Sequence, residues 1–131
     1  MPNSNEPKSE ARVKYEVLRD FGAKDWMRIW NNPRGVARPL SDPKAVVSYG
    51  INGQGDVSGI LYGGKRLEIE TKRPKGGMQR EAQEHFQAMI EEMGGVYCLA
   101  RSVDDVIRCL KRHGFERELE ESFGIERVRG L

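Results

Sequence analysis

The sequence predicts an α/β protein: a mixed β-sheet flanked by helices on both faces. Apolar residues recur at helical spacing in three segments, and they alternate or run together in the segments between. The resulting order is helix, strands, hairpin, helix, strand, helix, which is typical of a sheet packed between helices. With 131 residues, of which 37% are apolar and 32% charged, the chain fits one domain with a single core.

The N-terminal segment is expected to hold an arm and a helix. Residues 1–8 are polar and contain proline, which predicts a disordered arm before a single domain at residues 9–131. Ser9 is a suitable cap for a helix whose outward face includes Glu16. The inward stripe of this helix comprises Glu10, Val13, Lys14, Val17 and Phe21.

Strands and a long loop are expected next. Residues 26–30, WMRIW, alternate as a strand does. We expect the cluster of Trp26, Met27, Ile29 and Trp30 to belong to the core and not to form a base-stacking platform. Residues 31–43 contain asparagine, glycine and three prolines, which predicts a long loop. The segment AVVSYG at residues 45–50 is expected to return as a strand.

The C-terminal half alternates helix and strand. A helix is expected over residues 78–95, ending at the double glycine, followed by a buried strand at residues 96–100. A capping box from Ser102 to Asp105 then begins a second helix. The charged tail from Phe115 onward is expected to add one more helix.

Composition narrows the class of protein. The two cysteines lack CxxC spacing and no secretory segment precedes them, so neither a disulfide framework nor a zinc cluster is expected. No apolar run approaches the ~20 residues that span a bilayer. A protein that is cytoplasmic, not secreted and not bound in a membrane is therefore expected.

Charge is unevenly distributed, although the net charge is only +2. Six basic residues and two acidic ones lie within residues 65–80, whereas residues 81–100 carry four acidic residues and no lysine or arginine. A basic hairpin before an acidic helix suits a site that receives a polyanion on one side. From charge alone, an ordinary solvated surface is an equally good interpretation.

The hairpin at residues 55–76 carries the chemistry. Along a strand the side chains alternate, so Glu70 and Lys72 project from one face while Thr71 projects from the other. With Asp56 on the preceding strand, two carboxylates and an ammonium would surround a hard divalent cation, whose preferred ligands are oxygens. Taken alone, Glu70 and Lys72 are more readily interpreted as a surface salt bridge, because exposed ion pairs are common.

The loop of this hairpin decides whether the two carboxylates meet. A two-residue turn at 63–64 would place Asp56 and Glu70 on opposite faces of the sheet. A three-residue loop at 62–64 would set them directly across from each other, about 5 Å apart at Cβ. Such a loop needs a left-handed third residue, so Gly64 is predicted to have a positive φ. A bulge elsewhere would also restore the pairing.

Four segments in this order carry a resemblance to a known family: GQGDVSGI, LEIETKRPKG, AQEHF and GGVYCLARSVDDV. Over about Glu10 to Val106 the chain resembles the VRR-NUC (virus-type replication-repair nuclease) branch of the PD-(D/E)xK nuclease superfamily. The resemblance implies a restriction-endonuclease-like sheet and a DNA endonuclease that hydrolyses phosphodiester bonds with Mg²⁺ or Mn²⁺. A location in the cytoplasm of a bacterial or phage-type host cell is also expected.

The resemblance further implies roles for individual residues. The catalytic and metal-binding set is Asp56 and Glu70 as metal-binding acids, the backbone carbonyl of Thr71, the catalytic Lys72, Gln83 of the following helix and Glu10 of the first helix. Basic residues expected to hold DNA phosphates are Arg34, Arg38, Arg73, Lys75 and Arg80. Two departures are Thr71, where the family often has valine, and the segment 34–47, which matches no family motif.

Substrate and assembly follow from the same resemblance. Small members of the family are similar to Holliday junction resolvases, so we expect a homodimer that prefers four-way or flap-like DNA. The main alternative is a catalytically weak or inactive relative that serves as a DNA-binding module. An RNA target and a purely structural subunit are further alternatives, although no RNA-binding signature is present. His85 and His113 are expected to face solvent without a role.

Overall fold

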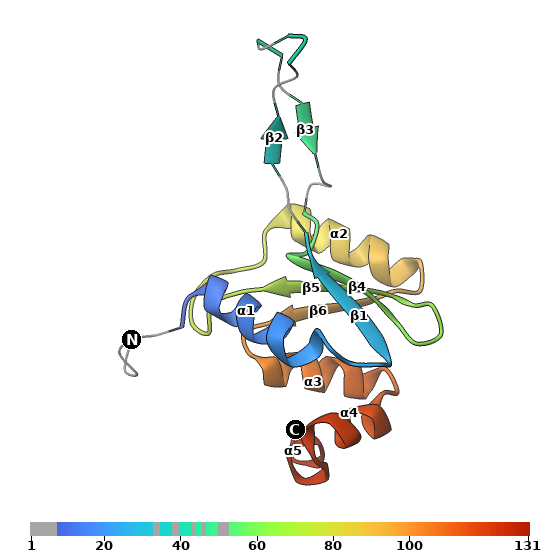
Figure 1. Ribbon diagram of the computed structural model, residues 1–131. Coiled ribbons are helices and arrows are strands. Elements are labelled where there is room, and N and C mark those ends of the chain that lie inside the picture. Colours follow the sequence, from blue (N-terminus) through green and yellow to red (C-terminus); the bar gives the residue numbers. More distant parts are fainter. Residues whose placement is uncertain (1–7, 33–34, 38–39, 43, 46, 50–52) are drawn as a thin grey trace.

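The computed structural model describes residues 8–32, 35–37, 40–42, 44–45, 47–49 and 53–131 (Figure 1). The elements are α1 (Glu10–Phe21), β1 (Met27–Asn31), β2 (Gly35–Ala37), β3 (Val47–Tyr49), β4 (Val57–Leu61), β5 (Arg66–Thr71), α2 (Glu81–Glu92), β6 (Val96–Ala100), α3 (Val103–Arg112), α4 (Glu116–Phe123) and α5 (Ile125–Arg129).

The main sheet is mixed, as predicted. Its strand order is β1-β4-β5-β6, with antiparallel pairs except for the parallel pair β5 and β6. Helices α1 and α3 cover one face and α2 covers the other (Figure 1). The predicted α/β sheet with helices on both faces is therefore confirmed.

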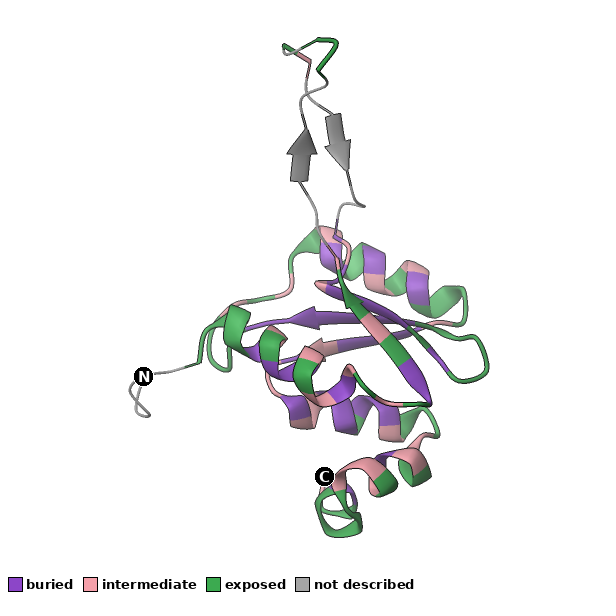
Figure 2. Ribbon diagram, viewed as in Figure 1, coloured by how far each residue is buried: buried purple, intermediate pink, exposed green. Residues whose placement is uncertain are grey.

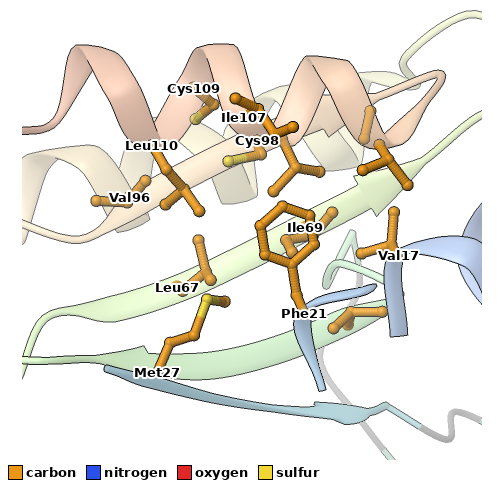
Figure 3. Packing of buried hydrophobic residues seen from close by; sticks show 14 of the residues in the cluster. Val17, Phe21, Met27, Leu67, Ile69, Val96, Cys98, Ile107, Cys109 and Leu110 are labelled. Atoms are coloured by element: carbon orange, nitrogen blue, oxygen red, sulfur yellow. The ribbon is translucent and has the colours of Figure 1, made fainter. Parts of the chain in front are cut away.

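Alternation along β5 separates two environments. Leu67 and Ile69 are fully buried in the large core between the sheet and helices α1 and α3 (Figure 3). Glu68 and Glu70 point to the α2 face, and they are buried as well. Figure 2 shows β5 buried along almost its whole length, whereas β1 is mostly exposed or half-buried. Strand β5 thus carries apolar side chains on one face and acids on the other.

Helix α1 begins as predicted but differs on its outer face. The Ser9 hydroxyl accepts a hydrogen bond from the Arg12 backbone N–H at 3.1 Å. Glu16, predicted to face solvent, is only 7% exposed. Its carboxylate accepts from Lys8 Nζ at 3.0 Å and Arg12 Nε at 3.1 Å. These two cations compensate for its burial, and the pKa of Glu16 is lowered although burial alone would raise it.

The cluster from Trp26 to Trp30 divides between the two faces of β1. Trp26 and Met27 are buried, and the indole of Trp26 stacks on Phe115 with a centroid distance of 5.5 Å. Trp30 is 44% exposed, so the prediction that it belongs to the core is wrong. The physical reason is that α2 does not extend over β1, which leaves that part of its face uncovered (Figure 1).

Two other expectations are corrected. The segment expected as a long loop contains β2, which pairs with β3 in a separate two-stranded sheet that projects from the body (Figure 1). The C-terminal tail forms two helices instead of one. Gly124, with φ of 93°, ends α4 and begins α5. No helix in the described part of the chain combines the length and apolarity needed to cross a membrane.

The loop between β4 and β5 has the predicted three-residue form. The Leu61 N–H donates to the Lys65 carbonyl at 2.9 Å, and Gly64 has φ of 87°. Gly63 also has a positive φ, 94°, which was not predicted. The register pairs Ser58 with Glu68, and two residues further along the same register places position 56 opposite position 70. The loop prediction is confirmed.

Candidate metal centre

Three carboxylates from distant parts of the chain meet where β5 ends. Glu10 comes from the first turn of α1, Asp56 directly precedes β4, and Glu70 is near the end of β5. One oxygen from each carboxylate lies within 4.8 Å of the others. The structure therefore brings together the three acids that the sequence assigned to the site.

Glu70 is the deepest of the three, with 1% of its surface exposed. Its Oε1 accepts a hydrogen bond from Gln83 Nε2 at 2.6 Å and lies 3.3 Å from Lys72 Nζ, whereas its Oε2 is buried without a partner. Burial raises the pKa of Glu70 to about 7, the Asp56 carboxylate adds to the increase, and Lys72 opposes it. The buried carboxyl group therefore titrates near neutral pH, and a bound divalent cation would favour its ionised form.

Asp56 is held in place by Thr71. Its Oδ2 accepts from the Thr71 backbone N–H at 2.9 Å and from the Thr71 hydroxyl at 3.0 Å. The hydroxyl contact was not predicted, since only the backbone carbonyl of Thr71 was assigned a role. A valine at this position would lack the second hydrogen bond, so the threonine adds a contact that orients Asp56.

Lys72 and Gln83 complete the buried part of the site. Lys72 is only 6% exposed, and its backbone N–H donates to the Ala100 carbonyl at 2.9 Å, which extends the pairing of β5 with β6. Gln83 is 1% exposed; its side-chain oxygen accepts from the Arg80 N–H at 2.9 Å. The side-chain amide of Gln83 donates to Glu70.

A basic segment follows the site. Arg73, Lys75 and Arg80 are exposed between the end of β5 and the start of α2. Arg101 fixes this segment, because its guanidinium donates to the carbonyls of Arg73 at 2.9 Å, Gly76 at 2.5 Å and Gly77 at 2.7 Å. Arg101 was not predicted to have a role, because the sequence shows only a single arginine directly after a buried strand. The predicted phosphate contacts Arg34 and Arg38 lie outside the described residues.

A second polar network lies beside the acids. Glu68 is fully buried; its Oε1 accepts from the Ser58 hydroxyl at 2.7 Å and from Arg66 Nε at 2.8 Å, and its Oε2 has no partner. Asn32 donates its side-chain amide to Ser58 and to the Gly55 carbonyl, and its backbone N–H to the Asp56 carbonyl. This network holds the backbone that carries Asp56, and no role was predicted for it.

Comparison of the chain with protein-family models, with curated proteins and with solved structures returned no match. The resemblance to VRR-NUC nucleases thus rests on the four sequence segments, and it stays a prediction.

Proposed function

We propose that the protein is a divalent-metal-dependent DNA endonuclease. The observation that carries this proposal is the acid cluster: Glu10, Asp56 and Glu70 share a space small enough for one ion, and Lys72 lies beside the deepest acid. Oxygen ligands of this kind suit Mg²⁺ or Mn²⁺. The mixed α/β sheet with helices on both faces and the VRR-NUC resemblance support the same assignment.

The buried carboxylates favour this proposal over a simple salt bridge. A Glu70–Lys72 pair accounts for only one oxygen of Glu70, because Oε2 is buried and unpartnered. Burying a carboxylate beside a second carboxylate destabilises its charged form. A divalent cation would satisfy the free oxygen and offset the repulsion between the acids. The donor set therefore fits the proposed metal.

Each side chain then has a role in phosphodiester hydrolysis. Asp56 and Glu70 would hold the ion with help from Glu10, and Thr71 and Gln83 keep the first two carboxylates oriented. When bound, the ion supplies a more acidic water and polarises the phosphate. Lys72, whose ammonium is held at 3.3 Å from Glu70, orients the attacking water or stabilises negative charge on the phosphorane.

The exposed basic segment would bind the DNA backbone. Arg73, Lys75 and Arg80 lie directly after the site and are suited to phosphates on either side of the cleaved bond. Their contacts carry no sequence information, and DNA affinity should fall steeply with salt. A domain of this size recognises DNA by shape, which is why we propose branched DNA as substrate and a homodimer as the active form.

The test is cleavage of four-way, flap and linear DNA in Mg²⁺ and in EDTA. We expect metal-dependent cleavage by the wild type, with loss by at least about 100-fold in Lys72→Ala and in the volume-conserving Lys72→Met. Cleavage that survives in both variants contradicts the proposal. Metal-independent DNA binding without cleavage would favour the inactive DNA-binding relative. A monomer that cuts linear DNA as fast as branched DNA contradicts the dimer and the branched substrate.

A further inference from the structure

The α2 face of the sheet is only partly covered. Helix α2 packs over Tyr97 and Leu99 of β6, whereas β1 and β4 extend beyond it (Figure 1). Trp30 is 44% exposed and Ile60 is 46% exposed on the uncovered part. In the register of β1 and β4, Trp30 lies opposite Ser58 and Arg28 opposite Ile60. An aromatic, an aliphatic and a cationic side chain therefore lie together on an open sheet surface.

This surface is continuous with the candidate metal centre. Alternate residues of a strand share a face, so Ser58 and Ile60 follow Asp56 on the same side of the sheet. Trp30 lies beside Ser58, about 7 Å along the strand from Asp56, and Ile60 is about 7 Å further. We call the surface formed by Arg28, Trp30, Ile60 and Arg66 the open track.

The charges of the open track are all of one sign. The Arg66 guanidinium lies over the Trp30 ring, 5.6 Å from its centroid. It also forms a salt bridge with the buried Glu68 at 2.8 Å. Arg28 is exposed. The strands β1, β4 and β5, all described in full, carry no exposed carboxylate, because Glu68 and Glu70 are buried. A hollow of about 400 Å³ lined in part by Lys65, Arg66, Ile90 and Met93 extends the track beyond the sheet.

We propose that the open track binds an unpaired segment of a nucleic acid next to the cleavage site, with a base stacked on Trp30 and phosphates held by Arg28 and Lys65. Exposed aromatics with flanking cations are what single strands need, since every base has a stacking face. A second copy of this chain fits less well, because a two-fold axis at the track would bring Arg28 and Arg66 near their own copies. The proposal rests on the proposed nuclease function for its substrate class.

The test measures binding without metal, so that cleavage plays no part. Fluorescence anisotropy in EDTA would compare labelled oligothymidylate with a duplex of equal length, for the wild type and Trp30→Leu. Tyr15→Leu is the matched control: Tyr15 is 54% exposed and has Arg12 and Arg19 at 5.4 and 5.8 Å from its ring centroid, but it lies on α1, across the sheet. We expect Trp30→Leu to weaken single-strand binding at least about five-fold and Tyr15→Leu to leave it unchanged.

Three results would overturn the inference. They are unchanged oligothymidylate affinity in Trp30→Leu, equal losses in Trp30→Leu and Tyr15→Leu, and conversion of a dimer to a monomer by Trp30→Leu with no change in affinity. The last result would assign the track to a second copy. Circular dichroism and thermal melting of both variants check that the fold is retained. If single-strand binding depends on Trp30 but no DNA is cleaved in Mg²⁺, the nuclease proposal fails and the open track stands.

Discussion

Replacing Glu70 by glutamine should stabilise the metal-free protein at alkaline pH. Burial, together with the nearby Asp56 carboxylate, raises the pKa of Glu70 from 4.5 to about 7. A carboxyl group with a higher pKa in the folded state binds its proton more tightly there than in the unfolded chain. Its contribution to stability is thus complete below about pH 4.5 and is lost as the pH rises through about 7.

The size of this loss follows from the pKa difference. Between 4.5 and about 7, at ~1.36 kcal/mol per pH unit, the ionised wild type is destabilised by about 3 kcal/mol. Glutamine has the shape of the protonated acid, cannot ionise, and can still accept the hydrogen bond that Gln83 donates at 2.6 Å. We therefore expect the free energy of unfolding of Glu70→Gln to exceed that of the wild type by about 2 to 3 kcal/mol at about pH 8. Near pH 5 the difference should be less than about 1 kcal/mol.

Urea unfolding in EDTA at the two pH values measures this difference. Glu84→Gln, which removes an exposed acid of α2, should show no such pH dependence. Added Mg²⁺ should reverse the order at alkaline pH, because ligand binding stabilises only a protein that binds the ligand. If Glu70→Gln is no more stable than the wild type at alkaline pH, the argument that burial opposes the charge of Glu70 is wrong.

Two further predictions concern the register and the second polar network. Gly64→Val should lower the free energy of unfolding by about 1 to 3 kcal/mol. It should also lower the Mg²⁺ affinity measured by calorimetry, because the loop sets the position of Asp56. Gly94→Val is the control, because Gly94 has the same φ of 87° and open space around it. It should lower the free energy of unfolding without changing Mg²⁺ affinity. A loss of Mg²⁺ affinity equal to that of Gly64→Val would contradict this prediction. Glu68→Ala should weaken Mg²⁺ binding about 10-fold, because Ser58 loses its hydrogen-bond acceptor. Glu68→Gln keeps that acceptor and should bind Mg²⁺ as the wild type does. Identical Mg²⁺ affinities of the two variants would refute the role of Glu68 in positioning Asp56.

The register of the β4–β5 hairpin was predictable, because Asp56 and Glu70 can hold one ion only if the strands pair so that both side chains lie on one face. With a side-chain period of two and no bulge in either strand, an odd number of loop residues is needed to put Asp56 and Glu70 on one face. The double glycine provides a residue that tolerates positive φ at the required place. Local sequence and the demands of the site therefore point to the same loop, and the structure has it. Helix caps at Ser9 and Ser102 were equally local and also form.

Features that depend on distant contacts were not predictable. Glu16 is buried because Lys8, eight residues away and outside the helix, supplies one of its two ion pairs. Trp30 is exposed because α2 does not extend over β1, and helix spacing in the sequence contains no information on how much of a sheet is covered. The pairing of β2 with β3 joins segments separated by prolines, which sequence rules assign to loops.

The site was predicted by residue type, but its supporting contacts were not. Asp56, Glu70 and Glu10 were expected to meet, and their carboxylates lie close together. Arg101 contacts the basic segment from 24 to 28 positions away in sequence, and Asn32 contacts Ser58 from 26 positions away. Neither residue belongs to a local motif. Their roles follow from the sheet, where residues remote in sequence become neighbours.

Strand β5 contributes to both the hydrophobic core and the candidate metal centre. Its apolar face gives the core Leu67 and Ile69, which are fully buried and stabilise the fold. Its other face buries two carboxylates, each with one oxygen that lacks a partner. Apolar residues of similar volume at those two positions would remove this penalty without altering the strand pattern of the opposite face. The acids are therefore unfavourable for folding alone, and the proposed cation at Glu70 would give a physical reason for at least one of them. Glu68 has a different role: it binds Ser58, which accepts a hydrogen bond from Asn32, and Asn32 in turn binds the backbone of Asp56.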